Sequence, residues 1–218
     1  MKNKKQGKIK AIIFDIGGVL KIPKTQNDNQ ELPGFHELIA KKLHLDFDTW
    51  FDAIDVYYAQ SIVGKVSKNE FIQIASKRLG INKNKLEKTI IQCYKSKMKK
   101  NIFLYNLAEK AKKQKIITAI LSDQWPYSKS GVFPKKDEKN FDIIIISYEV
   151  KMRKPNLEIY DLLLKKIKNK NKQIKNSEII YIDDRSYNLE PAKKHGIKTI
   201  LFRNNEQVKK ELKKFNVI

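Results

Sequence analysis

Five short runs of apolar and mostly β-branched residues constrain the fold of this chain more than any other feature. They occupy residues 9–14, 116–121, 143–146, 179–182 and 197–202, and polar residues or glycine bound each of them. Runs of this length and composition are typical of buried parallel strands. Helical patterns separate the later runs, at residues 102–113, 157–167 and 189–195, and Gly196 is placed to end the last helix. This alternation predicts an α/β fold, a doubly wound Rossmann-like parallel sheet with its site at the carboxyl ends of the strands.

The first two runs are separated by a long stretch in which we find no convincing strand. Helical spacing of apolar residues begins near Phe35 and again near Trp50, and residues 67–70 form a capping box ahead of a third helical pattern. We therefore expect an inserted small bundle of helices. The predicted domains are an α/β core of residues 1–21 and 101–218 and a helical domain of residues 22–100.

The chain is long enough, at 218 residues, to bury a substantial hydrophobic core. Cys93 is the only cysteine, so no intramolecular disulfide can form, and a reducing compartment is indicated. Residues 1–5 look like the basic start of a signal peptide, but Asp15 and two glycines interrupt the apolar stretch behind them. No stretch approaches the roughly 20 apolar residues of a membrane span. We expect a soluble cytoplasmic protein with no membrane partner.

The net charge of +22, from 46 lysines and arginines against 24 acidic residues, would attract polyanions. Most of the excess is lysine, whereas arginine, the better phosphate ligand, is scarce. A nucleic-acid binder would interleave aromatic and basic residues on one face, but Trp50, Phe51, Tyr57 and Tyr58 cluster at core-like helical spacing. We interpret the charge as compositional and the aromatic cluster as helix packing or a pocket wall. A nucleic-acid partner is not expected.

Polar side chains follow the first two predicted strands at the points where they end. Asp15 leaves the first strand and is followed by Gly17 and Gly18, which let the backbone turn sharply around a ligand. Ser122 ends the second strand, where its hydroxyl could donate to a phosphate oxygen. Each feature alone is also typical of an ordinary turn or helix cap.

Two more such segments follow. Lys154 stands at the mouth of a helix whose first turn we expect to contain Pro155, so its ammonium group could sit where charge builds on a transferring phosphoryl group. Asp183 and Asp184 close a fully apolar strand. Two adjacent carboxylates near a core are costly unless a cation or hydrogen-bond donors compensate them. A hard, oxygen-ligated ion such as Mg²⁺ is the natural candidate.

The order of these segments is more specific than any one of them. FDIGGVL at residues 14–20, LSD at 121–123, RKP at 153–155 and IDDRSYN at 182–188 resemble, in sequence order, the four motifs of haloacid dehalogenase-like hydrolases. The resemblance covers nearly the whole chain. The helical insertion between the first two motifs is similar to the small cap of the subfamily that inserts it there.

The resemblance implies a nucleophile and a metal site. Asp15 would attack phosphorus and form an aspartyl-phosphate that water then hydrolyses. The Asp15 carboxylate, the Gly17 carbonyl and Asp184 would hold Mg²⁺, and Asp183 would lie beside the ion without binding it. Asp184, rather than Asp183, matches the metal ligand of the family's fourth motif, because Arg185, Tyr187 and Asn188 then fall in register with the rest of that motif.

The resemblance also implies how the substrate is held. Ser122, Asp123 and Lys154 would form the phosphoryl-binding group, with Lys154 catalytic through its charge. The expected partner is a small phosphorylated metabolite, such as a sugar phosphate or a nucleotide-like monoester, and the expected assembly is a monomer or a homodimer. Residues 125–127, Trp-Pro-Tyr, could line the same pocket. No role is assigned to the histidines.

One position departs from the pattern of most phosphatases in this family, which carry a second aspartate as general acid where this chain has Gly17. Losing such a group typically costs about 10²–10⁴-fold in rate. The Gly-Gly form resembles a branch that includes sugar-phosphate phosphatases. A good leaving group, a water molecule or a cap residue could cover the proton transfer.

Two alternatives to a phosphatase stay open. Metal-independent 2-haloacid dehalogenases also lack the second aspartate, although a metal-free site for a carboxylate substrate gains nothing from Asp183 and Asp184. A catalytically weak relative that binds anionic ligands or nucleic acid is the other alternative.

Overall fold

A parallel five-stranded sheet forms the centre of the computed structural model, which describes residues 8–24 and 34–218. The strand order is β5-β4-β1-β6-β7. The strands are β1 (Ala11–Phe14), β4 (Ile117–Ser122), β5 (Ile143–Ile146), β6 (Ile179–Asp183) and β7 (Lys198–Leu201). All five predicted strands are present, with ends that differ by at most two residues, so the α/β prediction is confirmed.

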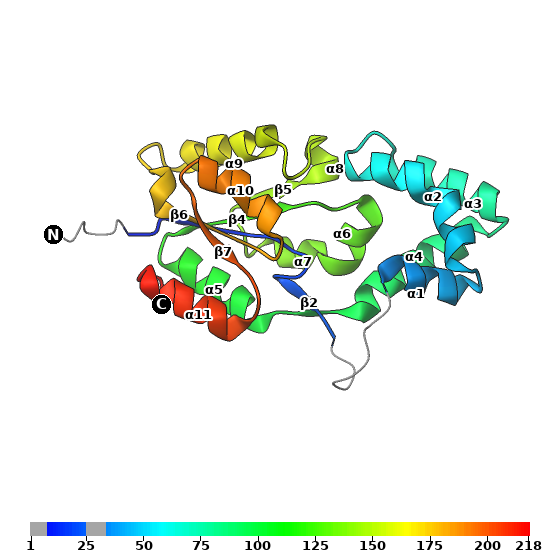
Figure 1. Ribbon diagram of the computed structural model, residues 1–218, viewed down its shortest axis with the longest axis horizontal. Helices are drawn as coiled ribbons and strands as arrows, with labels where there is room; N and C mark the ends of the chain where they lie inside the picture. Colours follow the sequence, from blue (N-terminus) through cyan, green and yellow to red (C-terminus); the bar gives the residue numbers. More distant parts are fainter. Residues whose placement is uncertain (1–7, 25–33) are drawn as a thin grey trace.

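Helices cover both faces of the sheet (Figure 1). The longer ones are α5 (Ile102–Lys113) and α11 (Asn205–Lys214) on one face and α9 (Leu157–Lys170) and α10 (Ser186–Lys194) on the other. Alternate side chains of β1 enter two hydrophobic clusters, Ile12 and Phe14 one of them and Ala11 and Ile13 the other. Burial of both faces explains why the strands are continuous apolar runs. The short segments α6 (Pro126–Val132), α7 (Lys135–Glu138), α8 (Ser147–Val150) and a 3₁₀ turn (Asn176–Glu178) complete this part.

Four helices between β2 and β3 lie together, away from the sheet (Figure 1). They are α1 (Phe35–Leu43), α2 (Phe47–Ile62), α3 (Lys68–Leu79) and α4 (Lys83–Lys97). The predicted capping box is present, because the Glu70 N–H donates to the Ser67 hydroxyl at 3.2 Å and the Ser67 N–H donates to the Glu70 carboxylate at 3.4 Å. The inserted helices are therefore where the sequence predicted them.

The expectation of no strand in the long insertion was wrong. A short antiparallel ribbon of β2 (Lys21–Pro23) and β3 (Met98–Lys100) joins the two chain segments that lead into and out of the four helices. Strands of three residues that contain lysine and proline have no apolar run to reveal them. One buried carboxylate, that of Asp137, pairs with both strands of the ribbon: it lies 3.6 Å from the Lys21 ammonium group and 2.5 Å from that of Lys100.

The start of α9 also differs from expectation. Pro155 does not lie in its first turn, because the helix begins at Leu157 after Asn156 as N-cap. The backbone N–H of Lys154 donates to Asp123 at 3.0 Å, which holds the preceding segment in a turn beside the end of β4. Helix α10 begins at Ser186, three residues before the expected start, and Gly196 follows it with a φ of 77°.

None of the helices in residues 8–24 and 34–218 is long and apolar enough to cross a membrane. Residues 1–5, which resemble the start of a signal peptide, lie outside the described residues.

Candidate active site

The carboxyl edge of the sheet brings three of the predicted segments together. Strands β1 and β6 are neighbours, with Phe14 opposite Ile182, so Asp15 and Asp183 leave the sheet next to each other. The Asp15 N–H donates to the Ile182 carbonyl at 3.0 Å, which extends the pairing by one residue. The parallel register therefore places these two carboxylates together.

Lys154 lies at the centre of this edge, with only 2% of its side chain exposed. Its ammonium nitrogen is 3.1 Å from Asp15 Oδ1 and 2.7 Å from Asp183 Oδ2. It also donates to the Tyr181 hydroxyl at 3.1 Å. Burial would lower the pKa of Lys154, but the charges of Asp15, Asp183 and Asp123 outweigh burial and raise it, so the group stays cationic.

Asp183 is fully buried and its carboxylate is saturated with donors. It accepts hydrogen bonds from the Arg185 N–H at 2.8 Å, the Asn188 amide at 3.1 Å, Lys154 and the Tyr181 hydroxyl. Burial would raise the pKa of Asp183, but Lys154 and the hydrogen bonds hold it below its usual value. The role of Asp183 in the structure is thus to fix Lys154 and the start of α10.

Asp15 and Asp184 have oxygen atoms to spare. Asp15 Oδ1 is buried and accepts no hydrogen bond in the described part of the chain, although it pairs electrostatically with Lys154. Burial raises the pKa of Asp15 to about 6, and Asp183 and Asp184 add to the rise while Lys154 opposes it. Burial and the charge of Asp183 also raise the pKa of Asp184. Both carboxylates would be more stable in the charged form beside a cation.

The three carboxylates could hold a metal ion, because each offers an oxygen within 4.8 Å of the others. The donors around Asp183 leave Asp15 and Asp184 as the ones with free lone pairs. The Gly17 carbonyl accepts no hydrogen bond from any described residue and adds a third oxygen. An all-oxygen set of this kind suits Mg²⁺.

Glycine is required at only one position of the Gly17-Gly18 pair. Gly18 has a φ of 76°, and a β-carbon there would collide with the Asp184 carboxylate. A β-carbon on Gly17 would meet no atom within 4 Å, and the φ of Gly17 is not in the left-handed region. Gly18 thus lets Asp184 approach the first motif, whereas the space beside Gly17 is open.

The other predicted site residues surround Lys154. Asp123 Oδ1 accepts the Lys154 N–H at 3.0 Å, and Asp123 Oδ2 lies 3.5 Å from the Arg153 guanidinium. Ser122 ends β4 but is fully buried, and it is not among the residues that line the cavity described next. Its hydroxyl accepts a hydrogen bond from the Gln124 amide at 3.1 Å.

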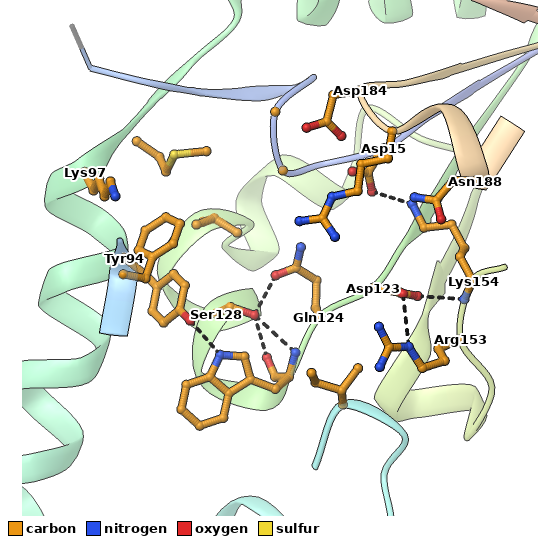
Figure 2. A pocket seen from close by; sticks show the side chains of 18 of the residues that line it. Asp15, Tyr94, Lys97, Asp123, Gln124, Ser128, Arg153, Lys154, Asp184 and Asn188 are labelled. Atoms are coloured by element: carbon orange, nitrogen blue, oxygen red, sulfur yellow. Dashed lines mark hydrogen bonds and ion pairs between the residues drawn. The ribbon is translucent and has the colours of Figure 1, made fainter. Parts of the chain in front are cut away.

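A cavity of about 400 Å³ opens between this edge and the inserted helices. Figure 2 shows Asp15, Asp184 and Lys154 on one side of it and Tyr94 and Lys97 on the other. The cavity lies where the sequence predicted the site, at the carboxyl ends of the strands. An anion in this cavity would lie beside the Asp15 carboxylate and the Lys154 ammonium group, covered by side chains of the inserted helices.

Some contributing residues were only partly foreseen. Trp125 lines the cavity as expected, but Pro126 and Tyr127 do not. Asn188 and Tyr181, which hold Asp183, were assigned no role. The signal for Asn188 was its place in the fourth motif, whereas nothing in the sequence marks a tyrosine inside a buried strand as a partner of the next carboxylate.

Comparison with known proteins gives a family match over most of the chain. A family model described as haloacid dehalogenase-like hydrolase matches residues 39–202. The bifunctional epoxide hydrolase 2 of Sus scrofa is 24% identical over 227 residues, covering 94% of this chain and 38% of that protein. The chain spans well under half the length of the curated relatives that it matches.

Solved structures share the fold. A HAD family enzyme from Bacteroides thetaiotaomicron, in complex with magnesium and inorganic phosphate, has a TM-score of 0.65 and 23% identity, covering 89% of this chain and 94% of that one. A predicted HAD-like hydrolase from Porphyromonas gingivalis has a TM-score of 0.70 and 17% identity, covering 96% and 98%.

Proposed function

This chain belongs to the haloacid dehalogenase-like hydrolase family, and from that premise we propose that it is a magnesium-dependent phosphatase that hydrolyses a small phosphomonoester through an aspartyl-phosphate on Asp15. The observation that carries the proposal is the pairing of buried Asp15 with the Lys154 ammonium group at 3.1 Å. The Asp184 carboxylate, which has free lone pairs, lies beside this pair. The magnesium and phosphate bound by the Bacteroides thetaiotaomicron enzyme of the same fold support it.

The proposed chemistry has two steps. An oxygen of Asp15 attacks phosphorus and the bond to the ester oxygen breaks, so that the alcohol leaves with a proton taken from solvent or a nearby donor. Water then attacks the aspartyl-phosphate, which releases inorganic phosphate and restores the carboxylate. Lys154 stays charged beside Asp15 and stabilises the negative charge that the transferred group carries.

The other site residues would bind the metal ion, orient Lys154 or support the phosphoryl-binding group. Asp15, Asp184 and the Gly17 carbonyl would hold Mg²⁺, whose contribution is to neutralise charge on the phosphoryl oxygens. Asp183 orients Lys154 without binding the ion. We propose that Ser122 and Asp123 support the phosphoryl-binding group from behind, Ser122 through its side-chain hydrogen bond to Asp15 and Asp123 by holding the backbone of Lys154.

The domain division is part of the proposal. Residues 1–21 and 101–218 would form the catalytic core and residues 22–100 the cap, which selects the leaving group. The β2–β3 ribbon supports this division, because both chain crossings between the two parts meet in it.

The acidic edge weighs against a metal-free haloacid dehalogenase. Asp184 has no cationic partner within ion-pairing distance among the described residues, and a carboxylate substrate would add a further negative charge beside it.

Trapping the intermediate tests the proposal. After brief mixing with radiolabelled acetyl phosphate and Mg²⁺ followed by acid quenching, the wild-type protein should carry label that hydroxylamine releases, as an acyl phosphate does. The Asp15→Asn variant should carry none. Equal labelling of the two proteins would refute the assignment of Asp15.

A further inference from the structure

The cavity has two chemically different sides. Its phosphoryl side carries the charged residues of the core, whereas the side formed by the inserted helices and α6 is largely apolar or aromatic. Figure 2 shows Tyr94 on that second side, opposite Asp15 and Asp184. We call Phe35, Tyr58, Ile62, Tyr94, Trp125 and Val132 the apolar wall.

The apolar wall is held in place by packing. Residue Trp125 is 1% exposed, and its indole contacts the rings of Tyr58 and Phe71, with centroid distances of 5.1 Å and 4.9 Å. Phe35 stacks on Tyr94 at 4.3 Å. Trp125 belongs to the core and the other rings to the inserted helices, so the wall is continuous across the two parts. A rigid aromatic surface of this kind favours a ligand with an apolar face.

Most polar groups on this side are already bonded to one another. The Ser128 hydroxyl donates to the Gln124 side-chain carbonyl at 2.6 Å and accepts the Trp125 N–H at 3.2 Å. The Gln124 amide nitrogen donates to Ser122, and the Trp125 indole N–H donates to the Tyr94 hydroxyl at 2.9 Å. Among the described residues, the hydroxyl groups of Tyr94 and Tyr58 donate to no acceptor, so a ligand with several hydroxyl groups would find few partners here without breaking one of these bonds.

The arginine and lysine side chains that line the cavity already have interactions of their own. Arg153 pairs with Asp123 at 3.5 Å, and the Arg185 guanidinium donates to the Tyr187 hydroxyl at 2.7 Å, both next to the phosphoryl side. On the far side, the Lys97 ammonium group lies 4.8 Å from the centre of the Phe35 ring.

The Tyr58 hydroxyl makes no hydrogen bond within the described residues, which leaves it for one polar atom of a ligand.

We infer that the alcohol released from the substrate carries a compact apolar ring rather than the several hydroxyl groups of a sugar. This inference rests on the proposed phosphatase function and names the class of its substrate. A sugar hydroxyl that is stripped of water without gaining a partner loses free energy, whereas an apolar ring gains free energy from the area that it buries. The inference differs from the sugar-phosphate expectation of the sequence, and the experiment below decides between the two.

A matched pair of esters tests the inference. 2-Phenylethyl phosphate and glucose 6-phosphate both release a primary alcohol, so their rates differ mainly through recognition of the leaving group. Acetyl phosphate, whose leaving group needs little of the cavity, reports on the phosphatase reaction itself. With Mg²⁺ present, we expect kcat/KM for 2-phenylethyl phosphate to exceed that for glucose 6-phosphate by about tenfold or more, which corresponds to about 1.4 kcal/mol.

The two failures are distinguishable. Turnover of acetyl phosphate together with an equal or higher kcat/KM for glucose 6-phosphate would overturn the inference and leave the proposed function standing. Failure to hydrolyse any of the three compounds would overturn the proposed function itself.

Two substitutions on the same helix test whether the apolar wall causes the preference for 2-phenylethyl phosphate. Ile62, which lines the cavity, and Val56, which is 53% exposed, both lie on α2. Ile62→Asn should lower the preference for 2-phenylethyl phosphate over glucose 6-phosphate several-fold, and Val56→Asn should leave it unchanged. An unchanged preference in folded Ile62→Asn would contradict the role of the apolar wall.

Discussion

The ammonium group of Lys154 lies 3.1 Å from the carboxylate of Asp15, and both side chains are buried at the carboxyl edge of the sheet. The pair brings together the first and third motifs, and Asp183 fixes it from the other side at 2.7 Å. A buried cation held by two carboxylates is positioned before any ligand arrives. Such preorganisation is what stabilisation of a phosphoryl group requires.

Lys154→Met should therefore impair both catalysis and stability. Removing the charge that we propose to stabilise the transferred phosphoryl group should lower kcat by about 10²–10³-fold. Leaving Asp183 buried without its partner should also reduce the free energy of unfolding by about 3–5 kcal/mol. Steady-state kinetics and urea unfolding measure the two effects. Lys165→Met, on the exposed face of α9, is the control and should change neither.

Gly17→Asp should raise activity toward esters of poor leaving groups. The space beside Gly17 accepts a side chain, and a carboxylic acid there could protonate the departing oxygen. We expect an increase of about 10²-fold for an alkyl phosphate and little change for p-nitrophenyl phosphate, whose leaving group needs no proton. An equal effect on both esters would show that the new group acts in some other way.

The neighbouring glycine provides the contrast. Gly18→Ala forces a β-carbon against Asp184 and places alanine at a φ of 76°. We expect Gly17→Ala to keep most of the wild-type kcat and Gly18→Ala to lose most of it. Comparable activity of the two variants would contradict the assignment of Gly18 as the residue that lets Asp184 approach.

Asp183 and Asp184 should respond differently to removal of their charge. Asp184→Asn should increase the Mg²⁺ concentration needed for half-maximal activity by about tenfold or more, because an amide is a weaker ligand for this hard cation than a carboxylate. Asp183→Asn should mainly lower the free energy of unfolding, because Lys154 loses its closest partner. Magnesium titrations and urea unfolding of both variants check this. A larger magnesium effect in Asp183→Asn would reverse the proposed roles.

His36 should make the fold less stable in mild acid. Burial lowers its pKa from 6.5 to about 4, and its Nδ1 already accepts the Trp50 indole N–H at 3.1 Å. Below the unfolded-state pKa the unfolded chain binds a proton that the native state does not, so stability falls as the pH drops from about 6.5 toward 4. Between about pH 7 and pH 5 the loss should be about 2 kcal/mol.

His36→Gln isolates that contribution, since glutamine can accept the Trp50 hydrogen bond without titrating. Urea unfolding at the two pH values should show a smaller loss for the variant than for the wild type. An identical pH dependence would exclude His36 as the cause.

Patterns of neighbouring residues were enough to predict the strands and helices whose ends depend on their own sequence. Strand Ile143–Ile146 and helix Ile102–Lys113 have the predicted bounds, because an unbroken apolar run and a helical spacing of apolar residues each mark their own ends. The order of polar residues at the strand ends likewise predicted that Asp15, Lys154 and Asp183 would meet.

Features that depend on distant segments were not predictable in this way. The β2–β3 ribbon exists because two crossings of the chain meet over Asp137, and neither strand has a pattern of its own. The same holds for the donors around Asp183, since the Tyr181 hydroxyl and the Asn188 amide reach it only in the folded chain. The apolar wall also combines residues from the core and from the inserted helices.

Release of inorganic phosphate from acetyl phosphate, compared between wild type and Asp15→Asn with and without Mg²⁺, tests the central claim most directly. We predict release by the wild type that requires Mg²⁺ and is abolished in folded Asp15→Asn. Wild-type release that survives removal of Mg²⁺, or equal release by Asp15→Asn, would contradict a magnesium-dependent phosphatase with Asp15 as its nucleophile.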